Sequence, residues 1–324
     1  MTLADKTLLV TGGTGSFGRA FVRALLDRHG VRRVIVYSRD ELKQHEMRVA
    51  FGDDRRLQFF IGDVRDEDRV RRAFEAAPDV VVHAAALKQV PACEYNPFEA
   101  IKTNVNGAQN VINAAIDTGV PQVLALSTDK AVNPINLYGA TKLCAEKLFV
   151  QGNSYAGGRG TRFSCVRYGN VVGSRGSVVP VFKQQSASGC LTVTDERMTR
   201  FWLTLDQGVA FVIASIERMK GGEVFIPRIP SMGIMDLAAA VAPGCRVEIT
   251  GIRPGEKLHE CLMSVDEARH ARAFPDFFVV VPEFQWWGDG HWEDGEPLAD
   301  GFCYTSDAND RWLGADELRA LTEL

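Results

Sequence analysis

The residue pattern with the clearest chemical meaning lies near the middle of the chain, where Tyr138 and Lys142 stand four positions apart at the start of a predicted helix. Residues at this spacing share one helix face, so we expect the Lys142 ammonium to lower the pKa of the Tyr138 phenol. Such a phenolate can take a proton from a sugar hydroxyl while hydride leaves the same carbon. The pair predicts oxidation of an alcohol, with Lys142 also holding the ribose of a cofactor.

A second group of polar residues, Thr128, Asp129 and Lys130, follows a predicted strand shortly before Tyr138. An enzyme that only removes and returns hydride at one carbon needs no more than a hydroxyl, a tyrosine and a lysine. One that also expels water must remove a proton beside the new ketone and protonate the departing hydroxyl. Asp129 and Lys130 can supply that acid and base, and the sequence leaves open which is which. A surface ion pair or a capping aspartate is the alternative.

A glycine-rich loop near the N-terminus predicts the cofactor site. Gly12, Gly15 and Gly18 follow a predicted strand and open a helix, which allows a tight turn, close approach to a pyrophosphate and a helix N-terminus pointing at it. A plain glycine-rich turn is the alternative. The neighbouring residues that we also place at the cofactor are Thr11, Ser16 and Phe17.

The end of the second predicted strand indicates which dinucleotide is bound. An NAD site expects an acidic residue there, whereas this chain has Ser38 and Arg39, with Lys43 one helical turn further on. A hydroxyl and a guanidinium suit a 2′-phosphate, so we predict NADP. The alternative is that Ser38 caps the next helix together with Glu41 and that Asp40 reaches the ribose.

The elements that must position these groups are short apolar strands alternating with helical segments. The five predicted strands cover residues 6–11, 33–37, 57–61, 79–82 and 122–126. This alternation predicts an α/β fold with a doubly wound parallel Rossmann sheet, whose ligands bind beyond the carboxyl ends of the strands. We expect a cofactor domain over residues 1–168, with segments near 200–226 returning to it, and a smaller C-terminal substrate-binding domain over 169–324.

Length and composition fit a folded cytosolic enzyme. The chain has 324 residues, 46% of them hydrophobic and 24% charged, and a net charge of −4, which argues against a nucleic-acid partner. Its seven cysteines are widely spaced, as in proteins of a reducing compartment. We find no signal segment and no apolar run long enough for a membrane helix, and expect a soluble cytoplasmic protein.

With these motifs in place, the chain resembles the inverting UDP-N-acetylglucosamine 4,6-dehydratases, which are extended short-chain dehydrogenase/reductases. The glycine spacing is also that of the wider superfamily. The matching runs are residues 37–43, 83–90, 127–142, 167–171, 173–180, 194–200, 251–259 and 304–310. Only residues 274–301, which include the Trp286-Trp287 pair, show no pattern that we can place. For that pair, packing in the core or at an interface is the safer interpretation.

The resemblance implies a role for each reactive group. Tyr138 deprotonates the C4 hydroxyl, NADP accepts the hydride, Lys142 orients the ribose and Thr128 hydrogen-bonds the sugar. Lys130 then removes the C5 proton, Asp129 protonates the departing C6 hydroxyl, hydride returns to C6, and C5 is reprotonated from the opposite face. The product is UDP-2-acetamido-2,6-dideoxy-β-L-arabino-hexos-4-ulose, the first intermediate toward pseudaminic acid for flagellin glycosylation. We expect burial and neighbouring cations to lower the pKa of Lys130.

The remaining implied contacts lie around these groups. Asp63 belongs beside the adenine, although a simple turn aspartate is the alternative. The other expected cofactor residues are Val64, Ala84, Ala85 and Ala86. We expect Asn170, Arg200 and Arg253 to contact the UDP diphosphate and ribose, Glu256 to accept ribose hydroxyls and Lys88 to face the sugar; each could instead be a solvated surface residue.

Other functions stay open from the sequence alone. A UDP-sugar 4-epimerase or a retaining 4,6-dehydratase would use the same scaffold, and the Asp129-Lys130 pair counts against the epimerase. An NADP-sensing regulatory protein could discard Tyr138 and Lys142, and both are present. A structural or partner-binding protein would need an exposed apolar groove or a charge block, which the sequence does not show. No metal is implied, and the family's members commonly form homo-oligomers.

Overall fold

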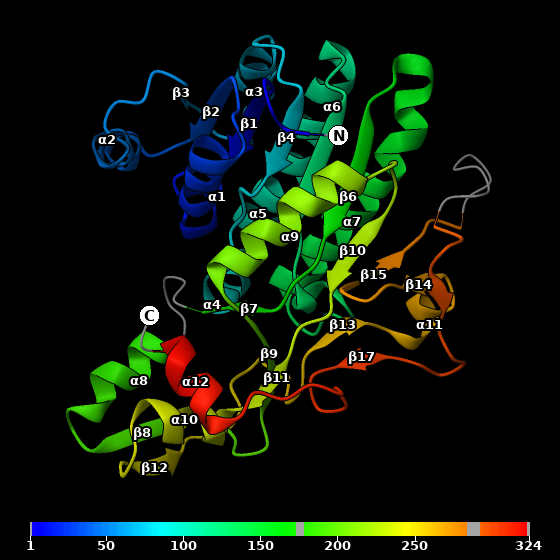
Figure 1. Ribbon diagram of the computed structural model, residues 1–324. Helices are drawn as coiled ribbons and strands as arrows, with labels where there is room; N and C mark the ends of the chain where they lie inside the picture. The colour runs from blue at the N-terminus through cyan, green and yellow to red at the C-terminus, as the bar shows by residue number, and fades with distance from the viewer. Residues whose placement is uncertain (1, 173–177, 284–291, 323–324) are drawn as a thin grey trace.

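The computed structural model describes residues 2–172, 178–283 and 292–322 (Figure 1). Its centre is a ten-stranded sheet. Across this sheet the parallel strands are β3 (Leu57–Ile61), β2 (Arg33–Ser38), β1 (Thr7–Thr11), β4 (Val80–His83), β5 (Gln122–Leu126), β6 (Arg162–Val166) and β10 (Val224–Pro227). All five strands predicted from the sequence form, and the doubly wound α/β fold is confirmed.

Helices cover both faces of the sheet because successive strand residues point to opposite sides. In β1, Leu8 and Val10 pack toward one cluster of buried residues and Leu9 toward another. The first face carries α1 (Ser16–Arg28), α2 (Glu41–Ala50) and α9 (Leu205–Arg218). The second carries α3 (Glu67–Phe74), α6 (Gly107–Thr118) and α7 (Leu137–Ala156). Between β4 and α6 lie α4 (Val90–Tyr95), α5 (Pro97–Ile101) and the π-helical turn η1 (Lys102–Asn106).

Three strands from the last part of the chain extend the sheet antiparallel beyond β10. They are β15 (Phe277–Val280), β14 (Ala271–Ala273) and β16 (Glu296–Pro297). Part of the stretch without a recognisable pattern, 274–301, thus contributes to this edge, where Phe274, Phe277 and Trp292 pack as an aromatic group. Trp286 and Trp287 lie outside the described residues. The domain boundary between residues 168 and 169 stays a prediction, and the sheet runs past it.

A smaller group of elements lies below the sheet in Figure 1 and has its own buried core. It contains α8 (Val178–Ser186), β8 (Cys190–Val193), α10 (Ile234–Val241), β12 (Arg246–Ile249) and α12 (Ala315–Thr322). A three-stranded sheet of β7 (Asn170–Val171), β9 (Thr199–Leu203) and β11 (Ser231–Gly233) lies beside this group. The strand pair β13 (Cys261–Met263) and β17 (Tyr304–Thr305) and helix α11 (Val265–Ala268) pack in a further buried cluster with residues of β10, β14 and β15. The 3-10 turns are η2 (Asp129–Ala131) and η3 (Gly157–Arg159). Within the described ranges, no helix has both the length and the apolar character to cross a membrane.

Candidate active site

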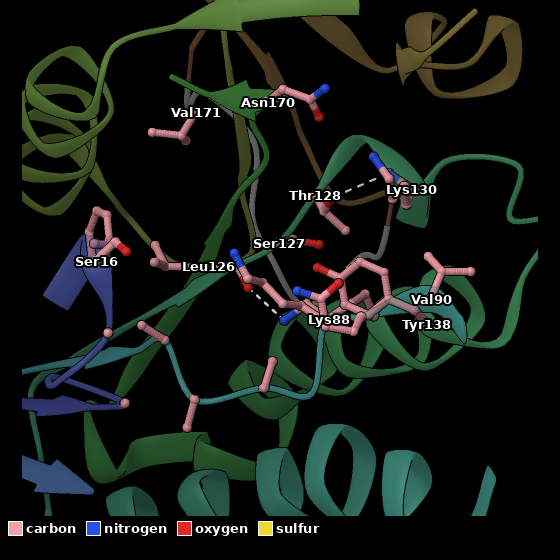
Figure 2. A pocket seen from close by; sticks show the side chains of 18 of the residues that line it. Ser16, Lys88, Val90, Leu126, Ser127, Thr128, Lys130, Tyr138, Asn170 and Val171 are labelled. Atoms are coloured by element: carbon pink, nitrogen blue, oxygen red, sulfur yellow. Dashed lines mark hydrogen bonds between the residues drawn. The ribbon is translucent and has the colours of Figure 1, made fainter. Parts of the chain in front are cut away.

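A cavity of about 770 Å³ opens at the carboxyl ends of the parallel strands, where a doubly wound sheet binds its ligands. Figure 2 shows Ser16 of the glycine loop at one side, Leu126 and Ser127 in the middle, and Tyr138 and Lys130 at the other. All the site residues predicted from the sequence line this cavity except Thr11. Thr11 lies behind the loop, where its hydroxyl is 2.8 Å from His83 Nδ1.

The glycine loop has the geometry of a phosphate cradle. Gly12 has a φ of +67°, and a Cβ there would stand 2.8 Å from the Ala85 nitrogen. A Cβ on Gly18 would stand 2.4 Å from the Gly13 Cα, so the loop and α1 meet at a distance that only glycine permits. Gly15 is the N-cap of α1 and the first turn holds no acidic residue. The helix N-terminus therefore offers N–H groups and a positive dipole to an anion in the cavity, which fits the pyrophosphate of a dinucleotide.

At the end of β2, two cations stand at the edge of the cavity beside carboxylates. Arg39 is paired with Asp63, with 3.5 Å between Nη1 and Oδ2. Lys43 is paired with Asp40, with 2.8 Å between Nζ and Oδ2. Asp40, rather than Ser38, caps α2, because its carboxylate accepts a hydrogen bond from the Lys43 backbone N–H at 3.0 Å. The alternative in which Ser38 caps this helix is therefore wrong.

Tyr138 and Lys142 lie on the buried face of the first turns of α7. The Lys142 ammonium donates to the Leu126 carbonyl at 2.7 Å, at the end of β5, and burial lowers its pKa. Burial raises the pKa of Tyr138 to about 12, although Lys130 and Thr128 act to lower it. The expected lowering of the phenol pKa by Lys142 is thus wrong, because burial dominates and the Lys142 ammonium points to a carbonyl.

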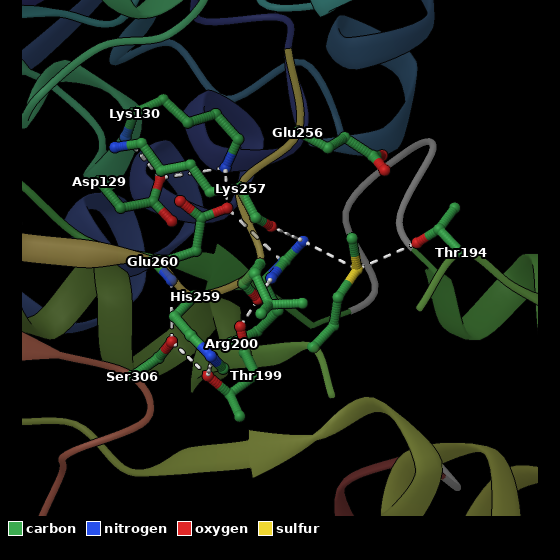
Figure 3. Close-up of polar contacts among 12 residues, drawn as sticks. Asp129, Lys130, Thr194, Thr199, Arg200, Glu256, Lys257, His259, Glu260 and Ser306 are labelled. Atoms are coloured by element: carbon green, nitrogen blue, oxygen red, sulfur yellow. Dashed lines mark hydrogen bonds and ion pairs between the residues drawn. The ribbon is translucent and has the colours of Figure 1, made fainter. Parts of the chain in front are cut away.

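Lys130 is held between two buried carboxylates (Figure 3). Its Nζ lies 3.2 Å from Asp129 Oδ1 and 3.3 Å from Glu260 Oε1. Burial lowers the pKa of Lys130, but the two carboxylates outweigh this and raise it above its usual range. The expected lowering is therefore wrong, since the neighbours that dominate are anions. Sequence reasoning missed Glu260, and the only signal was its place one residue after the run 251–259.

The residues expected to contact UDP differ in whether their side-chain donors already bond to protein groups. The Arg200 guanidinium donates from Nη1 to the Thr199 and Leu258 carbonyls at 2.7 and 2.9 Å, and from Nη2 to the Lys257 carbonyl at 3.1 Å. Its Nε lies 3.5 Å from Glu260 Oε1. Arg200 lines the cavity, but its donors are directed to protein groups.

Among the other expected UDP contacts, Arg253 and Lys88 are exposed, and Asn170 and Glu256 are partly buried. Arg253 is 69% exposed and pairs with Glu256 at 3.6 Å. Asn170 begins β7, and Lys88 follows β4. The structure therefore brings all of these side chains to one cavity together with Tyr138.

The doubly wound sheet, the glycine loop and the buried Tyr138 and Lys142 on α7 define an extended short-chain dehydrogenase/reductase. The chain belongs to the polysaccharide biosynthesis protein family, whose sequence profile matches residues 8–282. It is 52% identical to a Campylobacter jejuni protein named UDP-N-acetylglucosamine 4,6-dehydratase (inverting), with 97% of this chain and 96% of the relative covered.

The chain is also similar to a protein with a different name and to a solved structure. A Rickettsia canadensis protein named UDP-glucose 4-epimerase is 42% identical, with 85% of this chain and 83% of the relative covered. The solved structure of Pen from Bacillus thuringiensis superposes with a TM-score of 0.90 at 39% identity, and 99% of both chains is covered.

Proposed function

We propose that this protein catalyses the 4,6-dehydration of UDP-N-acetylglucosamine with inversion at C5. The observation that carries the proposal is the Asp129-Lys130 pair, which lines the same cavity as Tyr138 and the glycine loop. It supplies the additional acid and base that water loss requires and simple epimerisation does not. The 52% identity to a protein named as such a dehydratase supports the same substrate and stereochemistry.

The residues that would hold the cofactor surround the glycine loop. The N-terminus of α1 would hold the pyrophosphate, and Arg39 after β2 and Lys43 in the first turn of α2 suit a 2′-phosphate, which favours NADP. Asp63, Val64 and the alanines after β4 line the adjoining wall. The group held there would supply the hydride chemistry, taking a hydride from C4 and returning it to C6. Lys142 on α7, whose ammonium donates to the Leu126 carbonyl at the end of β5, would hold the ribose.

The proton chemistry follows from the contacts of this chain's own side chains. Tyr138 takes the proton of the C4 hydroxyl, and the nearby Lys130 ammonium and Thr128 favour its ionised form. Transfer of one proton over the 3.2 Å from Lys130 Nζ to Asp129 Oδ1 turns an ammonium and a carboxylate into an amine and a carboxylic acid. These are the base and the acid that the elimination needs.

The elimination then restores the pair. The Lys130 amine takes the C5 proton and becomes an ammonium, while Asp129 gives its proton to the C6 oxygen, which leaves as water. Asp129 Oδ2 is buried and has no hydrogen-bond partner among the described residues, so rotation of the protonated carboxyl group can carry the proton from the Oδ1 position to the side that faces that hydroxyl. A proton from solvent, delivered to C5 from the opposite face, inverts the centre, and Tyr138 releases to solvent the proton that it took from the C4 hydroxyl.

The substrate nucleotide belongs on the other wall of the cavity. Arg253, Asn170 and Lys88, which line the cavity, would contact the diphosphate and sugar, and Glu256 would contact the ribose hydroxyls. The engaged donors of Arg200 indicate that it acts on the site through Glu260 and the 257–258 backbone. The free thiols of all seven cysteines support a reducing compartment, and we place the enzyme in the cytoplasm. The resemblance supports a homo-oligomer and a first step toward pseudaminic acid.

Incubation with UDP-N-acetylglucosamine in D2O, followed by NMR, tests the proposed reaction. We expect a 4-keto-6-deoxy sugar with inverted C5 that carries solvent deuterium at C5, without added NADP when the purified protein retains it. The relative named as an epimerase makes 4-epimerisation the second candidate. Recovery of UDP-N-acetylgalactosamine without water loss would therefore replace the dehydratase by an epimerase.

A substitution of Lys130 tests the role of the pair. Lys130→Ala keeps Tyr138 and Lys142, so slow C4 oxidation should remain and appear as absorbance of the reduced cofactor, while water loss is blocked. Lys147→Ala, on the same helix as Lys142 but outside the cavity residues, is the matched lysine control. Full turnover by Lys130→Ala would remove Lys130 from the mechanism.

A further inference from the structure

We propose that Glu260 is a positioning residue of the acid-base pair, which holds the Lys130 ammonium beside Asp129 and sets how readily that ammonium gives up its proton. Its catalytic consequence rests on the proposed function, whereas its effect on Lys130 can be measured without turnover. Glu260 belongs to neither the glycine loop nor the Tyr138-Lys142 pair, and it comes from a segment 130 positions further along the chain than Lys130.

The Glu260 carboxylate is fixed from several sides. Its side chain is 3% exposed, and its Oε1 lies 3.3 Å from Lys130 Nζ and 3.5 Å from Arg200 Nε. The Glu260 backbone N–H donates to the Ser306 hydroxyl at 2.9 Å, and the Ser306 N–H donates to the Glu260 carbonyl at 2.8 Å. Figure 3 shows the carboxylate between Lys130 on one side and Arg200 on the other. A group held in this way has little freedom to leave Lys130.

The segment that carries Glu260 docks on the loop between Lys130 and Tyr138. The Asn136 amide donates to the Gly255 carbonyl at 2.8 Å, and Lys257 Nζ donates to the Val132 carbonyl at 2.5 Å. Gly255 has a φ of +78°, and a Cβ there would lie 3.1 Å from the Asn136 Cβ. The chain is therefore built to bring residues 255–260 against residues 130–136, with the Glu260–Lys130 pair as the third contact.

The charges around Lys130 explain why Glu260 matters for its proton. The titratable and charged groups that act on it are Asp129, Glu260, Arg200 and Tyr138. Two carboxylates and one guanidinium leave an excess of negative charge, which favours the ammonium over the amine. Without Glu260, Lys130 would face the uncompensated Arg200 guanidinium and only one carboxylate. The proton would then leave at a lower pH.

Glu260 Oε2 adds a second, independent observation. This atom and Asp129 Oδ2 are both buried without a hydrogen-bond partner among the described residues. Buried carboxylate oxygens are normally satisfied, so two such atoms beside one ammonium mark a place where polar groups of a ligand complete the network. The cluster is thus part of the reaction cavity rather than a purely structural ion pair.

Competitive labelling of Lys130 in the enzyme without substrate tests the proposal directly. The folded protein is treated with trace acetic anhydride at several pH values, and the extent of acetylation of each lysine is read by peptide mass spectrometry. Only the amine reacts, so the rate follows the neutral fraction, which rises about tenfold for each unit by which the pKa falls. In the wild-type protein we expect the Lys130 midpoint above the value of 10.5 for a free lysine side chain.

The variants separate charge from structure. Glu260→Gln keeps the shape and removes the charge, and Lys130 should label at least about tenfold faster near pH 8. Glu260→Asp keeps the charge, so the acetylation rate of Lys130 in that variant should stay within about threefold of the wild-type rate. The same is expected for Glu248→Gln, a matched change on the exposed strand β12. Wild-type labelling of Lys130 in Glu260→Gln would overturn the proposal. Where Glu260→Gln does not fold, a wild-type midpoint below 10.5 overturns it equally.

The pH dependence of turnover gives the second readout. Whether Lys130 serves as acid or base, the limb of the kcat profile that it controls should move to lower pH in Glu260→Gln and stay in place in Glu260→Asp. A labelling shift with no dehydratase activity in any variant, including wild type, would fault the proposed function and leave the role of Glu260 intact. An unmoved limb together with unmoved labelling would show that Glu260 is structural only.

Discussion

Replacing Gly18 by alanine should weaken binding of the dinucleotide about a hundredfold. The new Cβ would stand 2.4 Å from the Gly13 Cα and carbonyl oxygen, whereas ordinary contacts begin at 3.4 Å, so α1 and the loop must separate by about 1.0 Å. Alanine improves helix propensity by about 1 kcal/mol, but overpacking against backbone costs about 1–3 kcal/mol. A backbone N–H of the loop or of the α1 N-terminus that donates to the ligand over about 2.9 Å loses that hydrogen bond when it moves away by about 1 Å.

The expected magnitude follows from the charge of the ligand. A hydrogen bond to a charged group contributes about 1.5–3 kcal/mol, and about 2.8 kcal/mol corresponds to a hundredfold change in Kd. Isothermal titration with NADPH measures that change, and circular dichroism checks that the variant is folded. Gly158→Ala is the matched control, since a Cβ there meets nothing within 4 Å. A folded Gly18→Ala protein that binds NADPH within about threefold of wild type would refute the role of this contact.

Three further changes probe other parts of the structure. If the Arg39 guanidinium binds the 2′-phosphate as proposed, Arg39→Ala should weaken NADPH binding about tenfold and leave NADH binding nearly unchanged by calorimetry; equal loss for both would contradict that role. Burial, with a smaller effect of Lys142, lowers the pKa of His83 from 6.5 to about 3. The unfolded chain therefore takes up a proton at His83 below pH 6.5 while the folded protein does not. The free energy of unfolding should be unaffected by His83 above pH 6.5 and should fall by about 1.4 kcal/mol per pH unit between pH 6.5 and 3. Urea unfolding should show a shallower pH dependence in His83→Gln, and an equal slope would exclude this linkage. Arg167→Met should lower the free energy of unfolding by about 3–5 kcal/mol in the same assay. It leaves the Glu146 carboxylate, which is 3% exposed and lies 2.6 Å from Arg167 Nη2, buried without its cation. A decrease below about 1 kcal/mol would contradict this.

The sheet centre and its ligand edge were predictable because they rest on local patterns. Apolar strands alternate with helical segments, and the glycines of the phosphate loop stand directly between β1 and α1. The same logic placed Tyr138 and Asp129 at one edge, since the carboxyl ends of parallel strands converge there. These residues reach the cavity through elements that each occupy a short stretch of chain.

The features that the sequence did not predict depend on contacts between residues far apart in the chain. Glu260 meets Lys130 only because the fold brings together segments 130 positions apart, and neither residue carries a local signal for the other. The two pKa expectations failed for the same reason: burial around Tyr138 and the second carboxylate beside Lys130 arise from tertiary packing. The antiparallel strands β14 and β16 are too short to show an alternation.

The antiparallel extension of the sheet has a consequence for biosynthesis. Strand β10 gains its outer partner β15 only when residues 277–280 have left the ribosome, and β14 is covered by β16 later still. Until then the nascent chain carries an open apolar strand edge, of the kind that pairs with other chains. The segment with Glu260 emerges just before β15, so the nucleotide sheet and the acid-base cluster are completed in the same late interval of synthesis. A chain that ends before residue 260 would therefore lack both the outer antiparallel strands and the Glu260 carboxylate.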